Sequence, residues 1–216
     1  MVVIPCYNEA EGIADLVCEV QRYLPRVLIV DDGSTDATRS SATAAGAQVL
    51  VHRQNRGKGA ALKTGLAAAR EQGAGWALTM DGDGQHKPGD IPSFLAVAEN
   101  SSAALVIGNR MHDARSIPWM RRGVNRWMSR RLSLRAAKTL PDTQCGFRLI
   151  NLEAWTGLRL VTEHFEVESE MLLTFLSEGW PVAFVPIQTV GRGARSRIHP
   201  VLDAWRWWRW WRSSRP

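Results

Sequence analysis

The sequence predicts an α/β fold with a mostly parallel sheet flanked by helices, organised as a single domain. Short runs rich in β-branched residues alternate with helical stretches over the first hundred residues, which is typical of a doubly wound sheet. The connections between them are short, which favours parallel strands joined by helical crossovers. A chain of 216 residues is long enough to bury one such core.

The expected elements follow this alternation along the chain. Apolar runs predict buried strands at 2–4, 27–30, 48–51, 76–80 and 104–108. Amphipathic stretches predict helices at 9–24, 35–45, 58–72 and 88–100. Beyond residue 110 the pattern changes, and we expect helices at 118–138 and 165–180 and a strand at 181–190. Ligands of such sheets bind at the carboxyl ends of the strands, so the loops that follow the strands are the candidate site.

Charge is distributed unevenly along the chain. The net charge is +6, but residues 1–109 carry 9 Lys and Arg against 12 Asp and Glu, whereas residues 110–216 carry 18 against 9. This asymmetry predicts that an anionic partner meets the second half: nucleic acid, a phosphorylated substrate or an anionic lipid.

Cysteine content and hydropathy indicate the cellular compartment. The three cysteines show no metal-binding spacing and are odd in number, which disfavours a disulfide framework and favours a reducing compartment. No apolar run approaches the roughly 20 residues that cross a bilayer, and the first residues lack the form of a signal peptide. We therefore expect a cytoplasmic protein, peripheral on the cytoplasmic face of the plasma membrane if it meets a membrane.

The most informative loop is "LTMDGDGQH", at residues 78–86. Asp81 and Asp83 follow an apolar strand two positions apart, so both carboxylates can face one hard cation of the Mg²⁺ or Mn²⁺ type, with Gln85 or His86 nearby. The alternative is an acidic glycine turn that caps the next helix. A calcium loop fits less well, because no twelve-residue ligand pattern ending in Glu follows.

A second acidic pair ends the strand in "LIVDDGSTDAT". Asp31 or Asp32 could bind ribose hydroxyls or a base edge, as an acidic residue does in dinucleotide folds. The turn lacks the Walker pattern, so a P-loop is not expected.

A third segment, "NRGKGAALKTG", places Lys58 between two glycines at the start of a helix. This arrangement is a candidate anion contact, and the alternative is a plain junction between a loop and a helix.

Taken together with "IPCYNEAEG", these segments resemble family 2 glycosyltransferases of the GT-A fold. The resemblance is greatest to the polyprenyl-phosphate (dolichol-phosphate) mannosyl- and glucosyltransferases. The motifs that carry it are "IPCYNE", "VDDGSTD", "NRGKGAA", "DGDGQH", "IGNRM" and "DTQCGFRLI". They occur in the family's order over residues 2–198, which implies a GT-A domain at 1–198 followed by a basic, Trp-rich tail at 199–216.

The resemblance implies roles for individual residues. It implies that the pocket for the nucleoside of a nucleoside-diphosphate sugar is lined by Pro5, Tyr7, Glu9, Val30 and Asp32. Lys58 and Asp81 would complete the nucleotide site. It implies that Mg²⁺ or Mn²⁺ and the diphosphate are held by Asp81, Asp83 and Gln85. It implies that an acceptor phosphate meets Arg110, Arg121, Asn125 and Arg197, with Asp83 and these three arginines acting in catalysis.

Four further residues have expected roles. Arg148 in "CGFRL" is expected to brace its loop. Glu166 and Glu170 would share one face of a helix, and Glu168 would lie on another. We expect one of these glutamates to face the cleft, with Glu168 as the acceptor-side candidate, and the others to be solvated.

Charge suggests the chemistry. Displacing a nucleoside diphosphate from C1 of a sugar builds negative charge on the leaving group, which a cation on Asp81 and Asp83 would offset. We expect inversion by single displacement. A phosphate acceptor is already ionised at pH 7 and needs no strong base, whereas a hydroxyl acceptor would need one, for which Asp142 and Glu168 are the candidates.

Other functions remain as alternatives. Transfer to a soluble or cell-envelope hydroxyl is the nearest of them. A sugar nucleotidyltransferase normally has a Gly-rich, basic loop after its first strand, and "PCYNEAEG" has none. A nucleic-acid-binding module would explain the basic half and the tryptophans, but two acidic loops at strand ends would repel phosphate, so no nucleic-acid partner is expected.

The tail "DAWRWWRWWRSSRP" predicts an amphipathic helix over 201–212. On such a helix one arc holds Arg206, Arg209 and Arg212, and an opposing arc holds Trp207, Trp208, Trp210 and Trp211. This is the form of an interfacial membrane helix, which would hold the cleft near a lipid-phosphate acceptor. The alternative is that the tryptophans pack on the protein itself or on a second copy.

Overall fold

The computed structural model describes residues 1–112, 117–189 and 200–213. The strands are β1 (Val2–Cys6), β2 (Val27–Asp31), β3 (Gln48–Val51), β4 (Trp76–Thr79), β5 (Leu105–Asn109), β6 (Arg148–Asn151) and β7 (Val182–Pro186). The helices are α1 (Ile13–Gln21), α2 (Thr38–Ala44), α3 (Lys58–Glu71), α4 (Ile91–Asn100), α5 (Trp119–Ala136), α6 (Leu152–Thr156), α7 (Val167–Ser177) and α8 (Pro200–Ser213), with a 3₁₀ turn at Pro88–Asp90.

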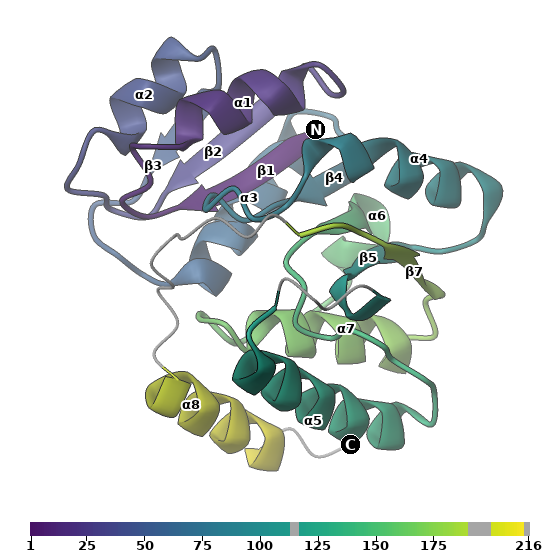
Figure 1. Cartoon of the computed structure of the whole chain (residues 1–216). Helices are drawn as coiled ribbons and strands as arrows, with labels where there is room; N and C mark the ends of the chain where they lie inside the picture. Colours follow the sequence, from purple (N-terminus) through teal and green to yellow (C-terminus); the bar gives the residue numbers. More distant parts are fainter. Residues whose placement is uncertain (113–116, 190–199, 214–216) are drawn as a thin grey trace.

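One seven-stranded sheet runs through the molecule in the order β3-β2-β1-β4-β6-β5-β7 (Figure 1). Every neighbouring pair is parallel except those of β6, which is antiparallel to both β4 and β5. The predicted mostly parallel α/β sheet is therefore confirmed. No strand was expected at Arg148–Asn151, because a charged residue, Arg148, begins this run although it is buried.

Helices cover both faces of this sheet (Figure 1). On one face lie α1, α2 and α4, and on the other lie α3 and α7. α1 shows why the sequence folds this way, since Ile13, Leu16, Val17 and Val20 recur at helical spacing and all are buried. The carboxyl ends of β1, β2 and β4 consequently meet at one edge of the sheet, where their loops come together.

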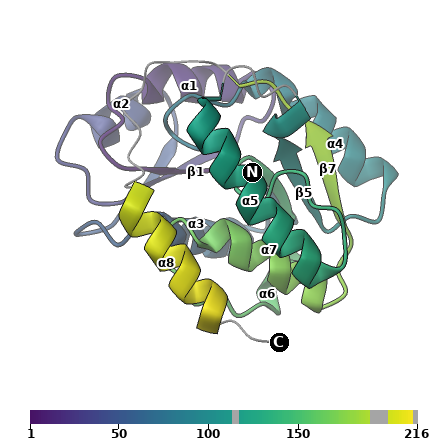
Figure 2. The ribbon, with the colours of Figure 1, turned by 60° about the horizontal axis from the view of Figure 1, so that its bottom comes forward.

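The helices α5 and α8 form a further layer beyond α7, where they lie side by side (Figures 1 and 2). The rings of Trp127 on α5 and Trp207 on α8 are 5.4 Å apart, and Trp207 stacks on Trp211. Trp207 is only 2% exposed, and Trp210 is buried as well. The expected tail helix is present. The prediction that its main tryptophan arc faces a membrane is wrong for Trp207, Trp210 and Trp211, which pack on the protein's own helices.

The outer side of these two helices is apolar and basic. We call it the α5–α8 surface, and its exposed members are Met120, Val124, Trp127, Leu134, Trp205 and Trp208 together with Arg126, Arg130, Arg131, Arg209 and Arg212. The apolar members on α5 recur at intervals of three, four and seven residues, which aligns them in one stripe. Among the described residues, no helix has the length and apolar character needed to cross a membrane.

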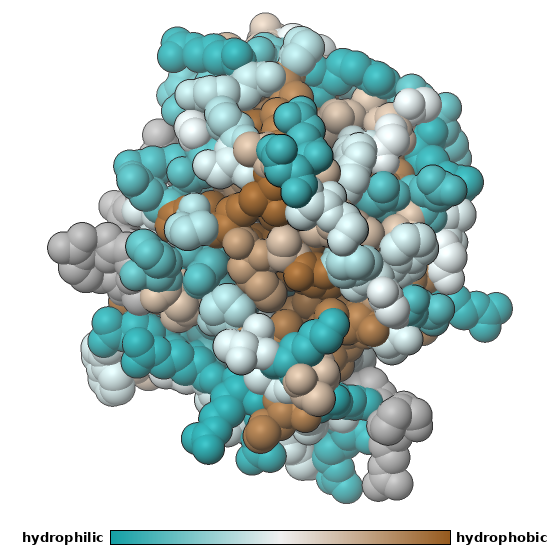
Figure 3. Space-filling view, turned by 90° about the vertical axis from the view of Figure 1, so that its right-hand side faces the viewer, coloured by the Kyte–Doolittle hydropathy of each residue, from teal (hydrophilic) through white to brown (hydrophobic). Residues whose placement is uncertain are grey.

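A second hydrophobic area lies at the sheet edge formed by β7. Val182, Ala183 and Phe184 are only half-buried there. Figure 3 shows this side of the molecule, on which hydrophobic residues gather in a band between hydrophilic margins. Exposed apolar surface is therefore not confined to the two outer helices.

Candidate active site

The loops after β1 and β2 are tied to each other at the carboxyl ends of these strands. Cys6 and Asp31 are opposite one another in the parallel register. Beyond them, the backbone N–H of Asn8 donates to Ser34 Oγ (2.8 Å), and the backbone N–H of Thr35 donates to Asn8 Oδ1 (2.7 Å). The first two loops therefore form one rigid wall.

Four of the residues predicted to bind a nucleoside belong to this wall or the strand behind it. Pro5, Tyr7 and Glu9 are half-buried at the strand end, and their contact with a nucleotide stays a prediction. Val30 is different, because its side chain is fully buried inside the sheet. Strand β2 points this side chain into the core, so a nucleotide contact at Val30 would come from its backbone, and that contact stays a prediction.

The Asp32 side chain holds the loop at residues 52–57. Its Oδ1 accepts from the backbone N–H of Arg56 (3.0 Å) and contacts His52 Nδ1 (2.6 Å), and its Oδ2 accepts from the backbone N–H of Gly57 (2.8 Å). The residue is also buried. Both carboxylate oxygens help to hold the start of α3, and the contact of Asp32 with a nucleotide stays a prediction.

The loop after β4 lies against the loop after β1 at Gly82. A Cβ atom at this position would lie 2.7 Å from Cys6 Sγ and 3.6 Å from Glu9 Cγ, so only glycine permits the contact. Asp81 and Asp83, on either side of it, are therefore held beside the Pro5–Glu9 loop, as the sequence predicts.

Asp81 contacts a lysine and a histidine. Its Oδ1 lies 2.6 Å from Lys58 Nζ, and its Oδ2 lies 3.2 Å from His86 Nε2. Burial acts to raise the pKa of Asp81, but Lys58 and His86 outweigh it and hold the pKa well below its usual range. Asp81 is therefore a fully charged carboxylate.

Asp83 behaves differently from its neighbour. Burial and the negative charge of Asp81 both raise its pKa, although the backbone N–H of Gln85 donates to its Oδ1 (3.0 Å). Two carboxylates that repel each other in this way are stabilised by a shared cation. Gln85 is half-buried in the same loop, and its side chain as a ligand stays a prediction.

Lys58 joins the two halves of the site. Its Nζ lies 2.6 Å from Glu168 Oε1 as well as from Asp81, and these carboxylates raise its pKa although burial opposes this. Glu168 is only 4% exposed, and its expected role on the acceptor side stays a prediction. Gly146 makes room for the cluster, because a Cβ there would lie 2.5 Å from Asp81 Oδ1 and 2.9 Å from Lys58 Nζ.

The start of α3 does not offer its backbone to an anion. The N–H groups of Gly59 and Ala60 both donate to the carbonyl oxygen of Glu163, at 2.7 and 3.2 Å. An anion contact in this segment would therefore come from the Lys58 side chain and not from the helix N-terminus.

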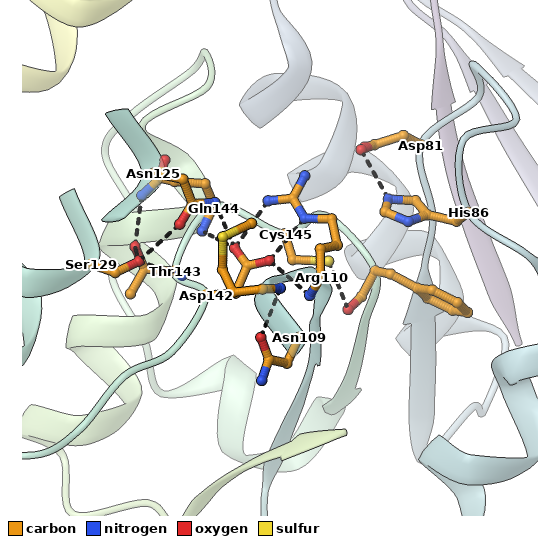
Figure 4. A network of polar contacts seen from close by, with 12 residues as sticks. Asp81, His86, Asn109, Arg110, Asn125, Ser129, Asp142, Thr143, Gln144 and Cys145 are labelled. Atoms are coloured by element: carbon orange, nitrogen blue, oxygen red, sulfur yellow. Dashed lines mark hydrogen bonds and ion pairs between the residues drawn. The ribbon is translucent and has the colours of Figure 1, made fainter. Parts of the chain in front are cut away.

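On the acceptor side, Arg110 forms a bidentate ion pair with Asp142 (Figure 4). Its Nε and Nη2 donate to Asp142 Oδ2 (2.8 Å) and Oδ1 (2.9 Å), and its backbone N–H donates to Oδ2 (3.1 Å). Burial would raise the pKa of Asp142, but Arg110 and Asn125 lower it. The alternative role of Asp142 as a general base is therefore wrong, because its carboxylate is fully buried and committed to Arg110.

Asn125 also turns toward Asp142 and not toward open cleft. Its Nδ2 donates to Asp142 Oδ1 (2.9 Å), its Oδ1 accepts from Ser129 Oγ (3.1 Å), and the residue is buried. Asn125 therefore supports Asp142, and its contact with the acceptor stays a prediction. Arg121 lies one turn earlier on α5 and is exposed, while Arg197 lies outside the described residues.

Arg148 braces its loop, as predicted. The buried guanidinium donates to the carbonyl oxygens of Thr143 (3.0 Å), Cys145 (2.7 Å) and Glu168 (2.7 Å), and burial lowers its pKa. Glu170 accepts from the backbone of Val161 and Thr162.

The expectation that two of the three glutamates of "FEVESE" are solvated is wrong. Glu166, Glu168 and Glu170 are all buried, since the first turn of α7 packs under the cleft. The positive end of a helix macrodipole stabilises carboxylates there.

Sequence reasoning missed the pairing of Lys58 with Glu168, and it named His86 only as a residue near the acidic pair. No local signal links Lys58 to Glu168, because they lie 110 positions apart and meet only when α3 and α7 pack under the same sheet edge. His86 follows Asp81 closely, and its place in "DGDGQH" was the one available signal.

Comparisons with known proteins agree with this geometry. The chain is 30% identical over 211 residues to UDP-N-acetylglucosamine–dolichyl-phosphate N-acetylglucosaminyltransferase of Methanococcus voltae, covering 87% of this chain and 84% of that protein. It is 30% identical over 207 residues to glycosyltransferase AglJ of Haloferax volcanii, covering 94% and 67%.

A solved structure shares the fold. Glucosyl-3-phosphoglycerate synthase of Mycobacterium tuberculosis, in complex with Mn²⁺, UDP and phosphoglyceric acid, superposes with a TM-score of 0.74 at 21% identity, covering all of this chain and 78% of that one. Other structures of that enzyme contain Mg²⁺ with UDP, or Mn²⁺ with UDP-glucose.

The family model for glycosyl transferase family 2 matches residues 1–156, a stretch that contains β1 to β6 and the loops of Asp81, Asp83 and Arg110. With the family model and the relatives in agreement, the chain belongs to glycosyl transferase family 2.

Proposed function

We propose that this glycosyltransferase moves a sugar from a nucleoside-diphosphate sugar to the phosphate of a membrane lipid, with inversion at the anomeric carbon. One observation carries the proposal. The acidic pair Asp81 and Asp83, with Lys58 beside it, follows β4, and Arg110 follows β5, which runs in the same direction because β6 is antiparallel to both. A donor side and an acceptor side would therefore lie at one edge of the sheet. The 30% identical relative from Methanococcus voltae, whose name states a dolichyl-phosphate acceptor, supports the acceptor class.

The residues present fit a divalent cation. Asp81 and Asp83 supply hard oxygen ligands two positions apart, and their mutual repulsion raises the pKa of Asp83. No group of three or more His, Cys, Asp or Glu side chains that could hold a metal occurs among the described residues. This suits Mg²⁺ or Mn²⁺, which commonly take one or two carboxylates and complete their shell with water and substrate phosphates. A cation there would act as a Lewis acid for the leaving diphosphate.

Lys58 would stabilise the donor side without a change of protonation. Its pKa is held above the usual lysine range by Asp81 and Glu168, so it stays cationic at all working pH values. Fixed positive charge in a cleft of low dielectric stabilises charge that develops on a leaving group. Glu168 holds the lysine from the opposite side and keeps it near Asp81.

Arg110 would orient the acceptor phosphate. Two of its nitrogens grip Asp142, which fixes the plane of the guanidinium, and its side chain remains 20% exposed. A phosphate monoester is ionised at pH 7, so the nucleophile needs no deprotonation. The two candidate bases do not suit a hydroxyl acceptor, because Asp142 is paired with Arg110 and Glu168 is paired with Lys58.

The α5–α8 surface would place this cleft at a membrane. Tryptophan and aliphatic side chains partition into the interface, and the surrounding arginines attract anionic headgroups. This surface differs from the tryptophan arc that the tail sequence alone indicates, because only Trp208 of that arc belongs to it. Trp205 and Trp208 are its exposed tryptophans on α8, and α5 supplies the rest.

A thermal-shift panel tests the donor side. The full chain is heated with UDP-glucose, UDP-galactose, UDP-N-acetylglucosamine and GDP-mannose, each with and without Mn²⁺. A ligand at one hundred times its Kd stabilises the folded state by about 2.7 kcal/mol, which raises the melting temperature by several degrees. We expect one nucleotide sugar to do this in the presence of Mn²⁺.

Asp83→Ala should abolish the Mn²⁺-dependent part of the shift, because it removes one of the two metal carboxylates. Glu99→Ala is the matched control, since it removes an exposed carboxylate on α4. If no nucleotide sugar shifts the wild-type protein, the proposed donor class is wrong.

A further inference from the structure

Trp207 links the tail helix α8 to α7 by a hydrogen bond within the aromatic packing. The indole N–H of Trp207 donates to Ser169 Oγ at 2.9 Å. Ser169 has no exposed surface, and it lies in the first turn of α7 next to Glu168. This directional hydrogen bond links α8 to the first turn of α7.

Ser169 connects this contact to the loop that carries "DTQCGF". Its hydroxyl also accepts from the side-chain amide of Gln144 (2.8 Å), and the same amide donates to Thr143 Oγ1 (2.9 Å). The tail helix thus touches, through a single hydroxyl, the loop that separates the two halves of the cleft.

From Thr143 the chain of hydrogen bonds reaches Arg110 (Figure 4). Thr143 Oγ1 lies 3.1 Å from Ser129 Oγ, which donates to Asn125 Oδ1 (3.1 Å). Asn125 in turn donates to Asp142 Oδ1 (2.9 Å), and the carboxylate of Asp142 grips Arg110. Every intermediate residue from Ser129 to Ser169 is buried or half-buried, so water does not readily replace these bonds.

We propose that Trp207 and Ser169 are positioning residues for the acceptor side, holding the loop around Thr143 and Gln144 so that Asp142 presents Arg110 to the acceptor. This inference rests on the proposed function for the role of Arg110. The inference links the packing of α8 against α7 to the position of Arg110 on the acceptor side. The loops after β1 and β2, on the donor side, are held by a separate set of bonds, those of Asp32, Asn8 and Ser34.

Hydrogen exchange in the full chain tests this coupling without any substrate. Three backbone N–H groups report the chain directly, because they donate to its side chains: Arg110 and Gln144 to Asp142, and Thr143 to Ser129. Trp207→Phe keeps the ring and removes the donor. We expect these three amides to exchange about tenfold faster in the variant, as for the loss of one buried hydrogen bond, when followed by NMR.

Two controls make the result specific. The amides of Asn8 and Gly57, which donate to Ser34 and Asp32 on the donor side, should exchange as in the wild type. Trp205→Phe, at a tryptophan that is 51% exposed, should leave all five amides unchanged. A uniform acceleration at all five in Trp207→Phe, or no change at the three reporters, would overturn the proposal.

Ser169→Ala gives an independent route to the same answer. It should accelerate the same three amides, and the double variant with Trp207→Phe should add little more, because both remove one link. In an assay with farnesyl phosphate and the nucleotide sugar identified above, each variant should raise the KM for farnesyl phosphate about fivefold and leave the donor KM unchanged. An equal rise in both KM values would indicate general loosening and overturn the proposal.

Failure of the proposed function is distinguishable from failure of this inference. A wild-type protein that transfers no sugar to any acceptor would refute the former, while the exchange measurements would still decide whether Trp207 and Ser169 hold the loop.

Discussion

Asp142 is a carboxylate without solvent exposure, and its charge is balanced within the protein. Arg110 contributes two side-chain hydrogen bonds to it, and Asn125 contributes a third. A buried pair of this kind adds little net stability compared with apolar residues, but the removal of one partner leaves an uncompensated charge. The role of the pair is therefore geometric, because it fixes the orientation of the Arg110 guanidinium.

Asp142→Asn should destabilise the protein by about 3–5 kcal/mol at pH 7, because it leaves Arg110 partly buried and unpaired. Urea denaturation measures the loss. Asp15→Asn, an exposed carboxylate on α1, is the control and should change stability by less than about 0.5 kcal/mol. A loss below about 1 kcal/mol for Asp142→Asn would show that the pair contributes no more than a surface ion pair.

The pH dependence of this difference has a defined sign. The folded state lowers the pKa of Asp142 below its ordinary value, so the contribution is present above the unfolded pKa of about 3.9 and is lost as pH falls through the folded value. The gap in stability between the wild type and Asp142→Asn should stay constant from about pH 8 to pH 5 and narrow only below about pH 4.

At the scale of elements, the start of α3 is where three parts of the chain meet. Gly57 has a φ of 101°, and its backbone N–H donates to Asp32. A Cβ there would lie 2.4 Å from both the carbonyl oxygen of Glu163 and Nδ1 of His164. The conformation places Lys58 under Asp81, so a change at Gly57 acts on the site as well as on the helix.

Gly57→Ala should destabilise the protein by about 2–4 kcal/mol, from left-handed backbone strain together with a steric clash. Gly73→Ala is the matched control. Its φ is 77°, but a Cβ would meet nothing within 4 Å, so strain alone should cost about 1 kcal/mol. Equal losses for the two variants in chemical denaturation would show that the contact with the Glu163 segment carries no energy.

At the scale of the whole molecule, the distribution of exposed apolar side chains indicates orientation. The α5–α8 surface carries Met120 at 65% exposure and Leu134 at 72%, among arginines. Figure 2 shows the two helices together on one side of the molecule. A flat pair of amphipathic helices is the arrangement expected of a protein that lies on an anionic membrane.

The double variant Met120→Glu/Leu134→Glu should reduce binding to vesicles of anionic phospholipid about tenfold or more, because charged side chains do not enter the acyl boundary. Co-sedimentation measures the binding. Tyr23→Glu, after α1 on the opposite side of the sheet, changes an aromatic side chain that is 42% exposed and should bind as the wild type does. Equal binding by all three proteins would remove the membrane orientation.

Much of the fold was predictable, because its signals are local. Alternation of apolar runs with amphipathic stretches is visible in the sequence, and five strands and their helices follow it. β6 was missed because its run RLIN begins with a charged residue, although Arg148 is buried. The motif placed Val30 and Asp32 at the end of β2, but only the structure showed that the Val30 side chain enters the core and that the Asp32 carboxylate holds the loop before α3.

The tail shows the same limit. Helical spacing correctly separated arginines from tryptophans, but an amphipathic helix buries its apolar face on whichever apolar surface is available. Here α5 and α7 supply that surface, and they cover Trp207 and Trp210.

The sequence by itself determined the α/β class, the family and the acidic loop of Asp81 and Asp83, because these depend on local composition and on ordered motifs. Only the tertiary structure decided that Lys58 pairs with Glu168, that Asp142 locks Arg110, and that Trp207 reaches Ser169. Each of these contacts joins residues more than thirty positions apart, and their meeting depends on how helices pack beneath the sheet, which no local pattern encodes.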